Sequence, residues 1–173
     1  MTRKYLIILI VVVLSLGTFF IFLNNGSLPI QNSGQTLDIV TFDDYSGNPY
    51  SLNQNGSKLI IVNSWASWCP FCKKELVDFV TATAKYSSDD ITIIAINRSE
   101  SVNTARRFSD ELNINDKVIF LVDFKDKFYK KIGGFSMPET LFMDKDLNIL
   151  EHKRGAMSED EIKEKIAKLL KEL

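Results

Sequence analysis

The sequence predicts an α/β domain with a central mixed β-sheet flanked by helices, preceded by one N-terminal transmembrane helix. Three observations support this. Residues 5–23 contain no charged side chain. Beyond them, apolar runs typical of buried strands alternate with segments whose apolar residues recur every three or four positions. The alternation closes with two successive strands and a helix, an order that favours parallel first strands and an antiparallel closing hairpin.

The uncharged segment 5–23 is long enough to span a bilayer. As a helix it measures ~28 Å, close to the ~30 Å thickness of the hydrocarbon core. Arg3 and Lys4 precede it, and the next basic residue is Lys58, so the positive-inside rule leaves residues 1–4 in the cytoplasm. The alternative is a cleaved signal peptide, but no A-x-A-like site follows the apolar run. We therefore expect a single-pass cell-membrane protein with an extracytoplasmic C-terminal domain.

The composition narrows what that domain does. The chain balances 21 Lys and Arg against 22 Asp and Glu at a net charge of -1, which argues against a nucleic-acid partner because such a partner requires a basic face. A single histidine, His152, excludes a His-rich metal cluster. Residues 24–36 are uncharged and rich in Asn, Gly, Ser and Gln, which predicts a flexible linker. We find no repeat and no second linker, so residues 37–173 are expected to form one domain.

The first elements of the domain follow from its apolar patterning. Residues 37–52 hold two short extended stretches around a Ser-Gly-Asn-Pro turn signal at 46–49. The run Leu-Ile-Ile-Val within 58–63 is typical of a strand buried on both faces. In 70–86, apolar side chains recur at three- and four-residue steps, which predicts a helix.

The second half repeats the alternation and ends in a helix with a clear start signal. Ser158 is followed three residues later by Glu161, the spacing of a capping box, and an apolar face continues to the C-terminus. Before it, the patterning predicts in order a strand over 91–97, a helix over 101–112, a strand over 118–122, a short helix over 126–132 and a hairpin of strands over 140–143 and 147–150.

The chemistry is concentrated at Cys69 and Cys72, the two cysteines of the chain. They stand where a buried strand gives way to a helix, and residues three apart on one helix face lie ~5–6 Å apart, a separation that a disulfide accepts. The positive end of the helix dipole favours a thiolate at Cys69, and the thiolate is the form that attacks disulfides. The spacing therefore predicts that Cys69 attacks and Cys72 resolves.

Two other uses of the cysteine pair are weaker. A closed zinc site takes four ligands, whereas the chain offers Cys69, Cys72 and at best His152. A purely structural disulfide is the second alternative, but a bridge that closes so short a loop stabilises a fold little.

Residues 62–75, Val-Asn-Ser-Trp-Ala-Ser-Trp-Cys-Pro-Phe-Cys-Lys-Lys-Glu, resemble the active-site strand and helix of thioredoxin-fold proteins. Within that fold the chain is similar to the TlpA/ResA/CcmG group of membrane-anchored thiol-disulfide oxidoreductases. Residues 136–140, Ser-Met-Pro-Glu-Thr, stand where the fold places its cis-proline loop, and 47–52 resembles the N-terminal hairpin of the group. The distance from the cysteines to this loop leaves room for the extra strand and helix that the group inserts. The resemblance covers 37–173.

The resemblance assigns roles to individual residues. Glu75 matches the acidic residue of the group, which would take the proton from Cys72 during resolution; the alternative is a solvated glutamate favoured by the helix dipole. Pro138 matches the cis-proline, and the Met137 backbone beside it would pair with a substrate strand. Trp68 is expected at the docking surface, and the tryptophan at position 65 in the core.

Other positions depart from the family pattern or carry little signal. Asn63 stands where thioredoxin keeps a buried proton-relaying Asp, so we expect no such relay there. Glu139 replaces the more usual Thr after the proline, at the expected rim of the substrate site. Phe71 replaces the His of strong oxidants and offers no hydrogen bond to the Cys69 thiolate, which favours a reductant. His152 is expected to be an ordinary surface residue.

The sequence thus predicts an extracytoplasmic enzyme that reduces protein disulfides, without cofactor or metal. The resemblance implies apocytochrome c as one substrate and a transmembrane thiol electron donor of the CcdA/DsbD type as partner. Two alternatives are a copper carrier that uses Cys69, Cys72 and His152, and a thiol peroxidase. Both are weak, because copper carriers of this fold usually space their cysteines by three residues and peroxidase chemistry requires a hydroxyl where the chain has Ala66.

Overall fold

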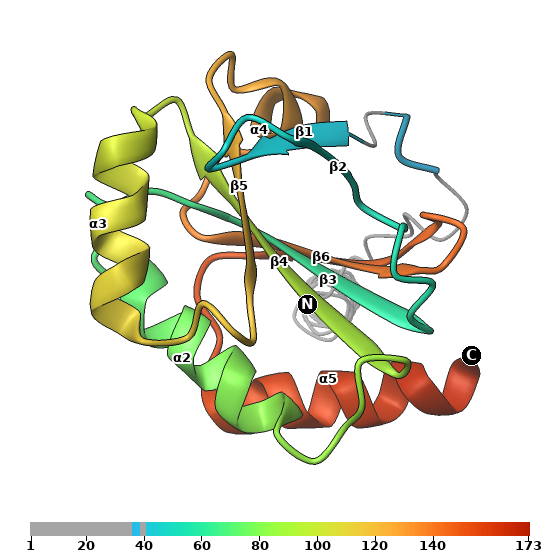
Figure 1. Ribbon diagram of the computed structural model, residues 1–173. Helices are drawn as coiled ribbons and strands as arrows, with labels where there is room; N and C mark the ends of the chain where they lie inside the picture. The colour runs from blue at the N-terminus through green and yellow to red at the C-terminus, as the bar shows by residue number, and fades with distance from the viewer. Residues whose placement is uncertain (1–35, 39–40) are drawn as a thin grey trace, which may run out of the picture. The chain divides into compact units, whose positions relative to one another are not determined.

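The computed structural model describes residues 36–38 and 41–173. These residues form one seven-stranded sheet and four helices (Figure 1). The strands are β1 (Thr41–Asp44), β2 (Pro49–Ser51), β3 (Leu59–Trp65), β4 (Ile91–Arg98), β5 (Ile119–Asp123), β6 (Glu139–Asp144) and β7 (Ile149–Arg154). The helices are α2 (Cys72–Thr83), α3 (Val102–Leu112), α4 (Lys127–Lys131) and α5 (Glu159–Glu172).

The sheet is mixed, as predicted, and its strand order is β2-β1-β5-β4-β3-β6-β7. The central strands β3, β4 and β5 are parallel, whereas β6 pairs antiparallel with β3, and β7 with β6. On the other side, β1 pairs antiparallel with β5 and with β2. Because β3 lies between β4 and β6, its central residue Asn63 stands beside Ala95 on one side and Thr140 on the other.

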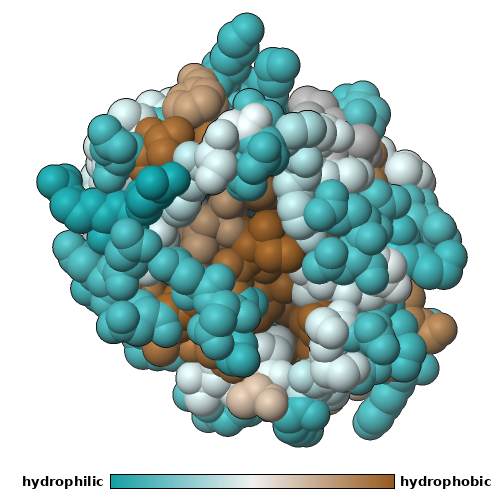
Figure 2. All heavy atoms as spheres, in the orientation of Figure 1, coloured by the Kyte–Doolittle hydropathy of each residue, from teal (hydrophilic) through white to brown (hydrophobic). Residues whose placement is uncertain are grey.

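Helices cover the two faces of the sheet unequally, as Figure 1 shows. Side chains of α2, α3 and α5 pack on one face, together with Leu59, Ile61 and Trp65 of β3. Alternate residues of the same strand, Ile60 and Val62, pack on the opposite face with α4. Every residue of β3 is buried, which explains its uninterrupted apolar run. In the same orientation, polar side chains cover most of the surface, and apolar ones gather in a hollow at its centre (Figure 2).

Element bounds differ from the sequence prediction at two informative places. Helix α2 begins at Cys72, not at residue 70, because residues 67–71 form turns that carry the chain over the end of β3. Strand β7 begins at Ile149, since Leu147 adopts a positive φ of 63° in the preceding turn and cannot extend a strand. The predicted start of the last helix is confirmed: the Ser158 side chain accepts a 3.2 Å hydrogen bond from the Glu161 N–H.

The predicted anchor at 5–23 and the predicted linker up to residue 35 lie outside the described residues. Within 36–38 and 41–173, no helix combines the length and the apolar character that crossing a membrane requires.

Candidate active site

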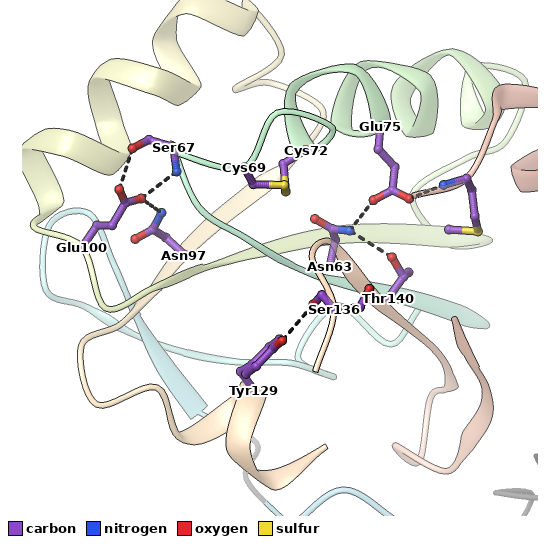
Figure 3. Close-up of a disulfide and its surroundings, with 11 residues drawn as sticks. Asn63, Ser67, Cys69, Cys72, Glu75, Asn97, Glu100, Tyr129, Ser136 and Thr140 are labelled. Atoms are coloured by element: carbon purple, nitrogen blue, oxygen red, sulfur yellow. Dashed lines mark hydrogen bonds between the residues drawn. A yellow bond between two sulfur atoms is a disulfide. The ribbon is translucent and has the colours of Figure 1, made fainter. Parts of the chain in front are cut away.

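The two cysteines form a disulfide where β3 turns into α2 (Figure 3). Their Cα atoms are 5.5 Å apart. Cys69 lies in the turn, where its N–H donates to the Ala66 carbonyl, and Cys72 is the first residue of α2. Both cysteines are almost fully buried, although their neighbour Trp68 is exposed.

A carboxylate that follows the neighbouring strand β4 holds the turn that carries Cys69. Glu100 follows β4 and accepts hydrogen bonds from the Ser67 N–H at 2.8 Å and the Ser67 hydroxyl at 2.5 Å. The Asn97 amide donates to the same carboxylate at 2.7 Å. Sequence reasoning missed this clamp. Its one available signal was position, because carboxyl ends of adjacent parallel strands meet at one edge of the sheet.

Glu75 belongs to the first turn of α2, three residues beyond Cys72, and its side chain is buried. Its side chain accepts a 2.8 Å hydrogen bond from Asn63 Nδ2 and another of 2.8 Å from the Met157 N–H. Burial raises the pKa of Glu75 to about 7 against the opposing effect of these two hydrogen bonds. The residue is 1% exposed, which excludes the solvated helix-start glutamate. A carboxyl group that titrates near neutral pH beside the pair suits proton exchange with a thiol.

Asn63 occupies the centre of this buried cluster. Its Nδ2 group donates to Glu75 and, at 2.9 Å, to the Thr140 hydroxyl. Among the described residues, its Oδ1 atom has no hydrogen-bond partner although the residue is fully buried. In Figure 3 this oxygen lies on the side of the amide that faces the disulfide. Asn63 cannot relay a proton as an Asp does, but its amide is hydrogen-bonded to Glu75 and Thr140.

The loop before β6 carries Met137, which packs against the hydrophobic cluster that includes both cysteines. The Met137–Pro138 peptide is cis, as the motif predicted. Ser136 is held on both sides: its N–H donates to Glu139 at 2.9 Å, and its carbonyl accepts from the Tyr129 hydroxyl at 2.9 Å. In contrast, no described residue forms a hydrogen bond with the Met137 backbone. That backbone is therefore available to an extended peptide.

Comparison with known proteins agrees with this geometry. The model of the Redoxin family matches residues 32–170. The chain belongs to the Redoxin family. Sporulation thiol-disulfide oxidoreductase A of Bacillus subtilis (strain 168) is 28% identical over 120 residues, which are 68% of this chain and 72% of the relative. Thiol-disulfide oxidoreductase ResA of Halalkalibacterium halodurans is 22% identical over 167 residues, 94% of this chain and 92% of the relative.

Solved structures confirm the thioredoxin-like fold of this Redoxin chain. The thioredoxin domain of a thiol-disulfide oxidoreductase from Bacteroides vulgatus superposes with a TM-score of 0.68 at 18% identity, covering 83% of this chain and 99% of that domain. Together with its relatives, the Cys69–Cys72 pair makes this Redoxin protein a thiol-disulfide oxidoreductase of the TlpA/ResA/CcmG type.

Two expectations for this Redoxin chain were wrong. Glu139 is fully buried and does not border the substrate site, and His152 is not a surface residue. Their side chains meet at 2.6 Å, between His152 Nε2 and Glu139 Oε2. Both lie on the face opposite Cys72, because His152 stands beside Leu141 in the β6–β7 pairing and Leu141 packs on the α4 side.

Glu139 stabilises the cis-proline loop that precedes β6. Its Oε1 atom accepts hydrogen bonds from the N–H groups of Phe135 at 2.7 Å and Ser136 at 2.9 Å. Burial acts to raise its pKa, but the hydrogen bonds from His152 and the two N–H groups outweigh burial, so the pKa of Glu139 lies below its usual value. An ionised carboxylate thus shapes the loop that presents Met137.

Three exposed aromatic side chains belong to the turn that carries the cysteines and to the cis-proline loop. Trp68 is 62% exposed, Phe71 60% and Phe135, in the cis-proline loop, 79%. Trp65 is instead buried and stacks on Phe108 with ring centroids 4.9 Å apart, so the predicted division between core and surface tryptophan is confirmed. An apolar surface of this kind suits contact with a peptide.

The structure does not assemble the ligand set of a copper carrier. His152 lies on the opposite face of the sheet from Cys72 and is hydrogen-bonded to Glu139. Within the described part of the chain, no three His, Cys, Asp or Glu side chains are grouped to hold a metal ion. Ala66, where a peroxidase requires a hydroxyl, is buried.

Proposed function

We propose that this chain is a membrane-anchored, extracytoplasmic reductase of disulfides in exported proteins, with apocytochrome c as one substrate. The direction is supported chiefly by what borders the attacking cysteine. Phe71 offers an aromatic ring where a donor would stabilise the Cys69 thiolate, and Glu75 adds a carboxyl group nearby. A less stabilised thiolate makes the dithiol a stronger reductant.

Each reaction transfers two electrons. The Cys69 thiolate attacks a substrate disulfide, breaks its S–S bond and forms a mixed disulfide, while the other substrate sulfur leaves as a thiolate. Cys72 then attacks Cys69 and releases the second substrate sulfur, so the substrate leaves reduced. The pair leaves the reaction oxidised, as it stands in the structure. A reductant outside the cytoplasm needs electrons from inside, so the partner is a transmembrane thiol donor of the CcdA/DsbD type. The uncharged run at 5–23 supplies the anchor, and Arg3 and Lys4 its orientation.

The reduction potential of the pair tests the direction. In glutathione buffers we expect a value nearer the about -270 mV of thioredoxin than the about -120 mV of the oxidant DsbA. A potential near the upper value overturns the reductase. Localisation is tested separately: the full chain should remain in the membrane after alkaline extraction, and protease added outside the cytoplasmic membrane should digest its C-terminal domain.

A further inference from the structure

The Asn63 amide presents an unsatisfied acceptor inside the active site. Both Nδ2 hydrogens are used, by Glu75 and Thr140, while Oδ1 has no partner in the described residues. Buried polar atoms without a partner are rare because each loses its hydration without compensation. Here the oxidised cysteines have no hydrogen to offer, since both sulfur atoms are in the disulfide.

The position of Asn63 indicates what supplies the missing donor. Along β3 it lies between Ile61 and Trp65, whose side chains pack on the same face as Cys72. Its free oxygen faces the disulfide in Figure 3. Once the pair is reduced, the Cys72 thiol becomes a donor on that side of the amide.

We propose that the Asn63 amide couples Cys72 to Glu75, so that the reduced site holds one proton between the two groups. This inference rests on the proposed reductase and concerns its resolving step. In one arrangement, the Cys72 thiol donates to Oδ1 while Nδ2 donates to the Glu75 carboxylate. When the amide turns over, Nδ2 donates to a Cys72 thiolate while Oδ1 accepts from a protonated Glu75.

The third neighbour permits both arrangements. The Thr140 hydroxyl accepts from Nδ2 in the structure, and a hydroxyl can equally donate to Oδ1 after the amide turns. By contrast, two protons or none on Cys72 and Glu75 leave one side of the amide mismatched in either orientation. Each mismatch leaves a buried polar atom unpaired, which disfavours that protonation state.

Two charged groups near Glu75 act on its pKa in opposite directions. Lys153 of β7 favours the carboxylate, and Asp78 of α2 favours the neutral acid. Lys153 is also paired with Glu161 of α5 at 2.8 Å. With the Met157 N–H these are the groups that act on Glu75 from the elements packed around it, and its pKa of about 7 lies close to working pH.

The amide thus takes part in the resolving step, in which Cys72 must lose its proton. The mixed disulfide joins Cys69 Sγ to a substrate sulfur. Cys72 releases its proton to water and Glu75 takes one up from water while the amide turns over, because the amide itself does not carry a proton. The Cys72 thiolate then forms a bond to Cys69, and the bond from Cys69 to the substrate breaks. The substrate sulfur leaves with the electron pair and takes a proton from water. The proton on Glu75 is available again when the pair is re-reduced.

A double-mutant cycle in a Cys69→Ser background of the full chain tests the coupling. The measured quantity is the pKa of the Cys72 thiol, followed by thiolate absorbance. With Asn63 present, an ionised Glu75 holds Oδ1 toward the thiol, so Glu75→Gln frees the amide and removes a charge. In Asn63→Leu, the same change removes the charge alone. We expect Glu75→Gln to lower the Cys72 pKa by about one pH unit more when Asn63 is present.

The matched control is Thr140→Val. Thr140 pairs with the amide in both orientations, so its loss should leave the excess effect of Glu75→Gln intact. An effect of equal size with and without Asn63 overturns the proposal. The outcome is independent of the direction of electron flow: a coupled pair with an oxidant's potential refutes the reductase alone.

A second readout does not depend on how Asn63→Leu folds. In the Cys69→Ser protein, the side-chain ¹⁵N signal of Asn63 should shift with the same midpoint as Cys72 thiolate formation, because the amide exchanges partners at that point. A signal that stays constant through this titration overturns the proposal.

Discussion

The Glu75 carboxylate accepts a 2.8 Å hydrogen bond from the backbone N–H of Met157, 82 positions away in the sequence. Met157 is buried in the connection between β7 and α5. With its other oxygen, Glu75 accepts from Asn63 of β3. One side chain of α2 therefore contacts both β3 and the connection that precedes α5. Its ionisation consequently affects the stability of the fold as well as the chemistry of the cysteines.

We expect the stability of the oxidised protein to fall as pH rises from about 4.5 to about 7. In this window the folded state binds a proton at Glu75, whose pKa is raised from 4.5 to about 7, and the unfolded state does not. The difference of about 2.5 pH units corresponds to at most about 3 kcal/mol. Urea denaturation at pH 5 and pH 8 measures this.

Substitution isolates the contribution of Glu75. Glu75→Gln should remove most of the pH dependence in this window, whereas Glu164→Gln, at an exposed position of α5, should retain it. If both variants keep the wild-type slope, another group titrates there.

The two cysteines should behave differently after reduction. Cys69 lies in a turn between the exposed residues Trp68 and Pro70, whereas Cys72 is enclosed at the start of α2. Iodoacetamide should therefore modify Cys69 much faster, with a thiol pKa below ~8.5. Cys72→Ser should accumulate mixed disulfides with substrates, and Cys69→Ser should accumulate few. Equal trapping by both variants contradicts attack through Cys69.

Sequence reasoning succeeded where burial alone decides structure. The apolar runs of β3 and β4 predict strands covered on both faces. The motif around Cys69 and Cys72 predicts that β3 is followed by a helix at the cysteine pair. His152 was missed because its face depends on pairing. A bulge between Phe142 and Met143 shifts the register of β6 and β7, and a shift of one residue moves every side chain to the other face.

The clamp on Ser67 and the Asn63 cluster were missed for another reason. Each depends on side chains brought together by the sheet from separate strands and loops, and spacing in the sequence carries no such information. Glu100 and Ser67 are 33 positions apart. Thr140 and Asn63 are 77 apart and meet because β6 pairs with β3.

The exposed aromatic residues should select for apolar residues next to the substrate cysteine. Phe71→Ser and Phe135→Ser should each lower kcat/KM about three- to tenfold for disulfide peptides with Leu or Phe flanks, since partial burial of a large side chain contributes about 1 kcal/mol. Peptides with Ser flanks should respond less. Phe124→Ser is the control, because Phe124 is 56% exposed at the end of β5, two strands from β3. An equal loss in all three variants argues against selection.

The Glu139–His152 pair should support the substrate loop from the opposite face. His152→Leu leaves a buried carboxylate without its 2.6 Å donor, which typically costs about 3 kcal/mol. His152→Gln keeps an N–H donor and should retain more of the stability. Both are measured by urea denaturation at pH 7.

Exchange rates with large and small substrates, and the pH dependence of stability, distinguish support of the cis-proline loop from a general effect on folding. Dithiothreitol is too small to need the Met137 backbone, so His152→Leu should reduce exchange with protein substrates while leaving exchange with dithiothreitol nearly unchanged. The lowered pKa of Glu139 stabilises the fold above the unfolded value of 4.5, and this contribution is lost as pH falls from there through the folded pKa. Glu139→Gln should therefore weaken the acid dependence below pH 4.5. If His152→Leu slows both exchange reactions equally, the Glu139–His152 pair acts on the cysteines and not on the cis-proline loop. The bond from Glu139 to the Ser136 N–H would then have no part in presenting Met137 to substrate.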